Sequence, residues 1–119
     1  MLLTLFSAGS TAACKHPGSA KLEGRWRGQR AAGVPAEAQA SADAFAIGSE
    51  IVAKGNQITI STPAAKNVTA TYFVDKEEPT GLVIHTDKDV SSETLVFVDP
   101  KTMTWKVDER RSIVFKKVE

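Results

Sequence analysis

Residues 93–107 read ETLVFVDPKTMTWKV, and this stretch decides the fold class. Apolar side chains occupy every second position on both sides of the turn-forming residues 99–101: Leu95 and Phe97 before the turn, Met103 and Trp105 after it. A period of two places alternate side chains on opposite faces of an extended chain. The stretch therefore predicts two half-buried β-strands joined by a tight turn.

The same rhythm runs through the rest of the chain. Turn-forming clusters rich in Gly, Pro, Asn, Asp and Lys recur about every ten residues, a spacing typical of an all-β meander. Between them, β-branched and aromatic residues alternate with polar ones, as expected of strands with one face buried. The pattern predicts eight strands, at about 22–28, 49–54, 57–62, 68–75, 80–86, 93–99, 102–107 and 111–118.

One segment breaks the rhythm. Residues 34–47 are rich in alanine, carry Pro35 at their start and stop at Gly48, which are helix start and stop signals. We expect this helix to cover one end of the sheet, with Phe45 and Ile47 as its apolar anchors. An eight-stranded sheet closes on itself and loses its exposed edges. The predicted fold class is therefore all-β: a small eight-stranded antiparallel up-and-down barrel over residues 22–119, with one short helix between strands 1 and 2.

The N-terminal residues have a different character. Residues 1–14 are apolar and then small, as in a secretory signal peptide, and residues 15–21 form a polar tether. Residues 11–14, Thr-Ala-Ala-Cys, resemble the lipobox of bacterial lipoproteins. The resemblance implies lipid on Cys14, a membrane anchor, and a place in the bacterial envelope at the outer membrane, facing the periplasm or the surface. The alternative is a frayed N-terminus with an incidental buried thiol. Cys14 is the chain's one cysteine, so it forms no intramolecular disulfide.

A second resemblance concerns the barrel. The Leu22-x-Gly24-x-Trp26 motif, the short meander and the last strand resemble the lipocalin-like domains of bacterial lipoproteins. This resemblance implies a barrel with Trp26 at its closed end, sometimes with a lumen for a small apolar ligand. The predicted ligand contacts are the large apolar side chains Trp26, Phe45, Tyr72, Phe97 and Trp105. The alternative is that the inward aromatic residues only fill the core, because a barrel of eight short strands has little spare volume.

The charge balance limits the partners. The chain carries 15 basic and 14 acidic residues, a net charge of +1. Proteins that bind nucleic acid or anionic membranes through their charge usually have a clear basic excess, so both classes are disfavoured. Arg25, Arg27 and Arg30 flank Trp26 and are expected on the outward face of the first strand, rather than in a platform for stacking nucleic-acid bases.

The sequence predicts no catalytic residue, metal or cofactor. His16 and His85 have no second His or Cys at metal-ligand spacing, and no Gly-x-Ser-x-Gly motif is present. We expect a non-enzymatic envelope lipoprotein that binds a small hydrophobic ligand. The alternative is a protein-interaction module, an inhibitor or assembly factor, that uses the loops of the barrel; an enzyme ranks third.

Overall fold

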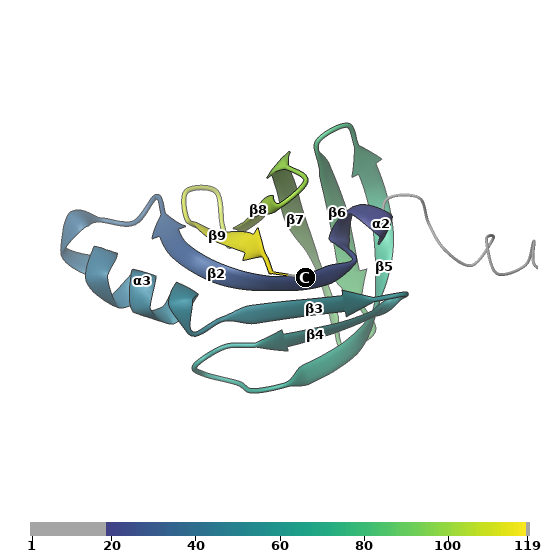
Figure 1. Ribbon diagram of the computed structural model, residues 1–119, viewed down its shortest axis with the longest axis horizontal. Coiled ribbons are helices and arrows are strands. Elements are labelled where there is room, and N and C mark those ends of the chain that lie inside the picture. Colours follow the sequence, from purple (N-terminus) through teal and green to yellow (C-terminus); the bar gives the residue numbers. More distant parts are fainter. Residues whose placement is uncertain (1–18, 119) are drawn as a thin grey trace, which may run out of the picture.

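The computed structural model describes residues 19–118, and Cys14 with most of the tether lies outside them. The described chain forms a closed antiparallel barrel in which each strand pairs with its neighbours in sequence and β9 returns to β2 (Figure 1). The predicted fold class is confirmed. The strands are β2 (Gly24–Ala32), β3 (Glu50–Lys54), β4 (Gln57–Ser61), β5 (Val68–Glu78), β6 (Gly81–Thr86), β7 (Asp89–Asp99), β8 (Thr102–Lys106) and β9 (Ser112–Lys117).

The first strand differs from its predicted range. Leu22 lies in a one-turn helix, α2 (Ser19–Leu22), and β2 continues past Gly28 to Ala32. The continuation is possible because the pairing of β2 with β9 shifts between Gly28 and Arg30. Such a bulge adds one residue to a strand without ending it. Ala31 consequently points inward and is buried.

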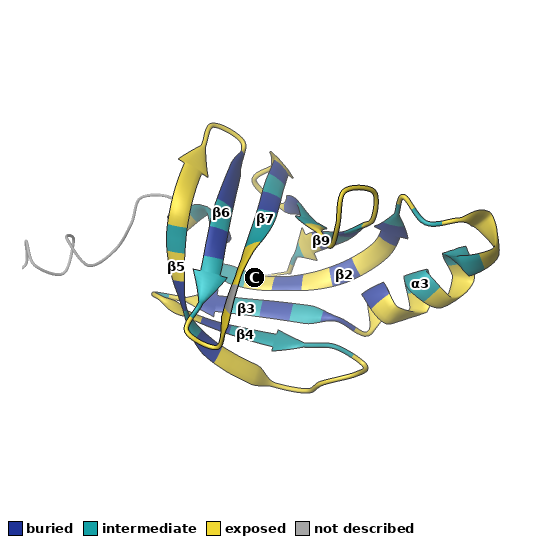
Figure 2. Ribbon diagram, turned by 180° about the vertical axis from the view of Figure 1, so that it is seen from behind, coloured by how far each residue is buried: buried dark blue, intermediate teal, exposed yellow. Residues whose placement is uncertain are grey.

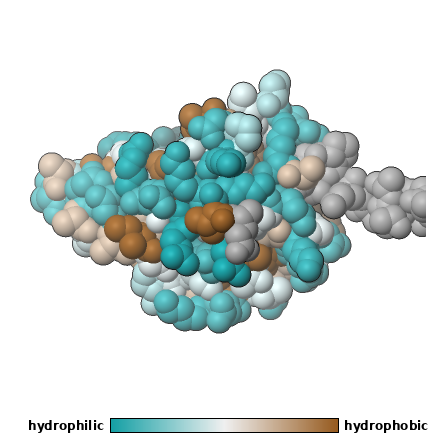
Figure 3. Space-filling view, in the orientation of Figure 1, coloured by the Kyte–Doolittle hydropathy of each residue, from teal (hydrophilic) through white to brown (hydrophobic). Residues whose placement is uncertain are grey.

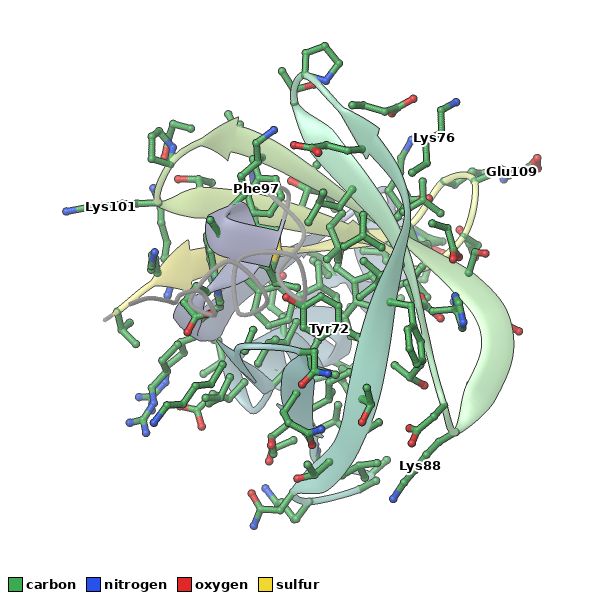
Figure 4. The ribbon with its side chains drawn as sticks, turned by 90° about the vertical axis from the view of Figure 1, so that its right-hand side faces the viewer. Tyr72, Lys76, Lys88, Phe97, Lys101 and Glu109 are labelled. Atoms are coloured by element: carbon green, nitrogen blue, oxygen red, sulfur yellow. The ribbon has the colours of Figure 1, made fainter. Side chains whose placement is uncertain are left out.

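The core lies inside the barrel, as the two-residue rhythm requires. Figure 2 shows buried and exposed positions alternating along β2. Trp26, Met103 and Phe115 are fully buried within one hydrophobic cluster that also takes in side chains from the other strands. Figure 4 shows Tyr72 and Phe97 pointing into the barrel, whereas the charged side chains that it labels point outward. Burial of this apolar surface is the main contribution to folding free energy.

The predicted helix is present as a 3-10 turn (Ala36–Ala38) followed by α3 (Gln39–Ile47), but the prediction of its anchors is wrong. Phe45 is 38% and Ile47 61% exposed, whereas Ala46 is fully buried. The reason lies in Gly28 of β2, where an added Cβ would stand 1.9 Å from the carbonyl oxygen of Ala46. The absent side chain lets the helix backbone approach the strand directly.

Polar contacts complete the attachment of α3. The Ala31 amide donates a hydrogen bond to Asp43 Oδ1 at 2.9 Å, and Gln39 Nε2 donates to the Ala31 carbonyl and to Asp43 Oδ1, both at 2.9 Å. The two bonds that Asp43 accepts, the one from the Ala31 amide more than the one from Gln39, lower the pKa of this carboxylate.

Between residues 19 and 118, no helix has the length and apolar character needed to cross a membrane.

Candidate functional site

The two ends of the barrel are built differently, and the end that carries α2 is tightly packed. Gly24 has a φ of 128°, a conformation that residues with a Cβ rarely adopt. The turn at Gly24 allows the buried indole of Trp26 to donate a hydrogen bond to the Leu22 carbonyl at 2.9 Å. The Trp26 and Phe97 rings lie 5.8 Å apart, and Lys117 Nζ lies 5.6 Å from the Trp26 ring centre. The Leu-x-Gly-x-Trp motif therefore forms a plug at this end.

A hollow lies outside this plug. It has a volume of about 340 Å³. Its wall combines apolar, lysine and aspartate side chains from α2, β7, β9 and the β5–β6 and β7–β8 turns: Ala20, Lys21, Pro79, Thr80, Phe97, Asp99, Pro100 and Lys117. Lys21 is held at one side by hydrogen bonds from its ammonium to the Glu78 and Pro79 carbonyls at 3.3 and 3.4 Å.

The opposite end carries α3 and a smaller apolar groove. The groove has a volume of about 210 Å³ and runs between α3 and the β8–β9 turn. Its lining is Ala31, Val34, Ala42, Phe45, Val107, Arg111, Ser112 and Ile113. We call it the α3 groove. Phe45 and Val107, on its two sides, keep 38% and 49% of their surface exposed. Large apolar side chains left in contact with solvent at a hollow mark a candidate contact surface.

The turn beside the α3 groove is held by a carboxylate. Asp108 accepts hydrogen bonds from the Arg111 and Arg110 amides at 2.7 and 2.9 Å and from Arg111 Nε at 2.7 Å. These donors, the Arg111 amide first, lower the pKa of Asp108 from 3.8 to about 2. At neutral pH the ionised carboxylate therefore fixes the Arg111 side of the groove.

The five predicted ligand contacts do not meet in one place. Trp26 and Tyr72 belong to the packed core, where the Trp26 ring contacts Phe97. Trp105 is half-buried, and its indole donates a hydrogen bond to Glu93 Oε1 at 2.8 Å. Phe97 lines the hollow at the α2 end, and Phe45 lines the α3 groove. The hollow and the α3 groove thus each contain one of the five residues.

Sequence reasoning missed a cluster on the outer face of the sheet. His85 Nδ1 lies 2.6 Å from Asp75 Oδ1, and the imidazole stacks on the Phe73 ring at a centroid distance of 5.0 Å. The Ser92 hydroxyl lies 3.5 Å from Asp75 Oδ2. Nucleophilic catalysis would need the hydroxyl to bond to the imidazole, with the carboxylate behind it. Here the serine and the histidine both contact the carboxylate, so the arrangement is a hydrogen-bonded cluster on the surface.

The cluster had no signal in the sequence because irregular pairing creates it. Asp75 lies where the register between β5 and β6 shifts, and residues 90–92 lie where β7 shifts against β6 beside His85. Neither bulge follows from the spacing of the three polar residues.

Within residues 19–118, no group of three or more His, Cys, Asp or Glu side chains is placed to hold a metal ion.

The fold and these sites define a small antiparallel β-barrel whose inward side chains form one packed core and whose described hollows open at its ends. No protein-family model matches the chain, and no curated protein or solved structure matches it. Its function is therefore inferred from its own geometry.

Proposed function

We propose that the protein is a non-enzymatic, lipocalin-like binding module of the bacterial envelope, anchored at the outer membrane by lipid on Cys14, and that it contacts its target with the α3 groove. The observation that carries the proposal is the contrast between the packed core and the exposed Phe45 and Val107. The chain enters the barrel through α2, at the opposite end from α3 (Figure 1). An anchor before residue 19 would therefore leave the α3 groove accessible.

The size of the groove favours a protein partner. Sites for small organic ligands usually enclose about 300–1,000 Å³ and surround most of the ligand. The α3 groove, at about 210 Å³, suits one apolar side chain of a partner. Arg111 at its edge offers a guanidinium, although Asp108 already engages it. We therefore rank the protein-interaction module, an inhibitor or assembly factor, above the carrier of a small molecule.

A small hydrophobic ligand is the second candidate function. The hollow at the α2 end supports it, because its volume of about 340 Å³ reaches the usual range and Phe97 forms part of its wall. Native mass spectrometry of the protein purified from its own host tests this candidate. A bound small molecule that is lost in the Phe97→Ala variant would favour it over the partner hypothesis.

Site-specific photo-crosslinking in the host cell tests the leading proposal. A photoreactive amino acid at position 107 should give one discrete protein adduct. The matched control places the same group at Val98, a valine on β7 that is 68% exposed and lies outside the groove. Equal adducts from both positions, or none from position 107, would contradict the role of the α3 groove.

The anchor is tested separately. The N-terminal peptide of the mature protein should carry acyl chains on Cys14, and the Cys14→Ser variant should leave the membrane fraction. Mass spectrometry that finds an unmodified Cys14 would overturn the envelope assignment while leaving the groove experiment valid.

A further inference from the structure

Basic and acidic residues are concentrated on different strands of the barrel, although the net charge of the chain is only +1. The adjacent strands β8, β9 and β2 contain six basic residues and no acidic one: Arg25, Arg27, Arg30, Lys106, Lys116 and Lys117. Strands β5, β6 and β7 contain a single lysine and six acidic residues: Asp75, Glu77, Glu78, Asp89, Glu93 and Asp99. In the closed order of strands, β2 stands across the barrel from β6, so one side is basic and the opposite side is acidic.

The basic side carries a row of outward arginines. Trp26 and Gly28 point inward and are buried, so Arg25 and Arg27 point outward, and Arg30 follows them after the bulge. Lys116 of β9 pairs with Arg27 and extends the row sideways. We call Arg25, Arg27, Arg30 and Lys116 the arginine row. Figure 3, in which β2 faces the viewer, shows a largely hydrophilic surface interrupted by separate apolar patches.

The arginine row has four cations and three carboxylates near them, an excess of one positive charge. Asp43 lies close enough to Arg30, and Asp99 to Lys116, for their charges to interact. Glu50 of β3 lies 3.9 Å from Arg25 Nε and 3.3 Å from Arg27 Nη2, so two guanidinium groups share one carboxylate. The side chains of Arg25 and Arg27 remain 45% and 58% exposed. Arg30 is also exposed. An excess of exposed guanidinium groups on one face attracts anionic groups, whatever the total charge of the molecule.

We propose that the arginine row binds the surface of an anionic lipid membrane. A barrel is convex, so it touches a plane along the length of one or two strands. Alternate residues on a strand lie about 6.6 Å apart, which lets successive arginines reach different headgroups. Guanidinium groups bind phosphate oxygens in pairs of hydrogen bonds.

The position of the arginine row in the barrel is compatible with a chain that is anchored through its N-terminal segment. β2 starts two residues after α2, so Arg25 lies at the end where the N-terminal segment enters the barrel. This link rests on the proposed lipid on Cys14, but the charge of the row does not. The net charge of +1 disfavoured a membrane contact only because it sums over both sides. Screening limits each exposed charge to a range of about 10 Å, so the membrane would respond to the basic side alone.

Vesicle co-sedimentation of the full chain with Cys14→Ser, which carries no lipid, tests the row independently of the anchor. The probes are phosphatidylcholine vesicles with and without phosphatidylglycerol. We expect binding to the anionic vesicles that falls with added salt, and little binding to phosphatidylcholine alone. The variant Arg25→Gln/Arg27→Gln/Arg30→Gln should lose about tenfold or more in the partition coefficient, since each basic residue near the surface contributes to it.

Two controls make the result decisive. The variant Lys66→Gln/Lys76→Gln/Lys88→Gln removes the same charge away from the row and should bind within about twofold of the parent. Glu50→Gln removes the shared carboxylate and should bind anionic vesicles more tightly with no gain on phosphatidylcholine alone, whereas apolar surface exposed by misfolding would raise binding to both. Absence of binding to anionic vesicles, equal losses in both triple variants, or arginine-dependent binding to DNA or an acidic protein but not to vesicles would overturn the proposal. None of these outcomes bears on whether Cys14 is acylated.

Discussion

The two ends of the barrel are closed in opposite ways. At the α2 end, Trp26 and Leu22 are fully buried, and the single N–H group of the Trp26 indole donates a hydrogen bond to the Leu22 carbonyl. At the α3 end, closure depends on one missing side chain at Gly28 and on hydrogen bonds to Asp43, while Phe45 and Ile47 face solvent. The closure at the α2 end stabilises the barrel through buried apolar area. The closure at the α3 end leaves apolar surface available for contacts outside the barrel.

The largest expected effect is at the α2 end. Trp26→Ala should lower the free energy of unfolding by about 3–5 kcal/mol, because it leaves a cavity in the core and an unpaired carbonyl. Phe45→Ala at the α3 end should lower it by less than about 1 kcal/mol, since that ring is only partly buried. Urea unfolding of both variants measures the difference. Similar losses would show that the two ends are closed alike.

The next effect concerns the attachment of α3. Gly28→Val places a side chain where the Ala46 carbonyl now stands, so the helix must move away at a cost of about 1–3 kcal/mol. Amide hydrogen exchange should speed up in residues 39–47 while β4 keeps its protection. Unchanged protection of α3 would mean that the close approach of helix and strand does not hold the helix.

A smaller, pH-dependent effect follows from Asp43. Its pKa is lowered because the ionised carboxylate accepts hydrogen bonds from Ala31 and Gln39. The stabilisation is therefore present above the ordinary value of 3.8 and is lost as the pH falls through the lowered pKa. The chemical shift of the Ala31 amide should titrate in this acid range, and Asp43→Asn should abolish the titration. A titration that survives in Asp43→Asn would assign it to another group.

The smallest effect is confined to the β8–β9 turn. The pKa of Asp108 is lowered from 3.8 to about 2. The hydrogen bonds that its carboxylate accepts from Arg110 and Arg111 should therefore persist at pH 4 and weaken as the pH approaches 2. Amide signals of both arginines measure it, with Asp108→Asn as the reference for the open turn. Turn signals that already change between pH 7 and 5 would contradict this assignment.

The sequence predicted the strands well and the sites poorly, for physical reasons. Alternation is a local property, so ranges such as 57–62 and 102–107 fall within a residue of β4 and β8. The anchors of α3 were mistaken because hydropathy points to Phe45, whereas the decisive feature is the absent Cβ of Gly28. The Asp75–His85 contact depends on bulges. The outward direction of Arg25, Arg27 and Arg30 was predicted, whereas Lys116 joins them only because β9 pairs with β2.

The pairing of β2 with β9 joins the earliest and latest strands of the described barrel, with Trp26 opposite Lys117. A nascent chain therefore exposes β2 as an unsatisfied edge until residues 112–117 have been made. Contacts so distant in sequence form slowly, because most of the chain must be ordered before they are gained. A molecule cut short before β9 would keep two open edges, and such edges pair readily with those of other chains. The barrel therefore closes only after β9 has been made, and termination before β9 should produce aggregates rather than a smaller barrel.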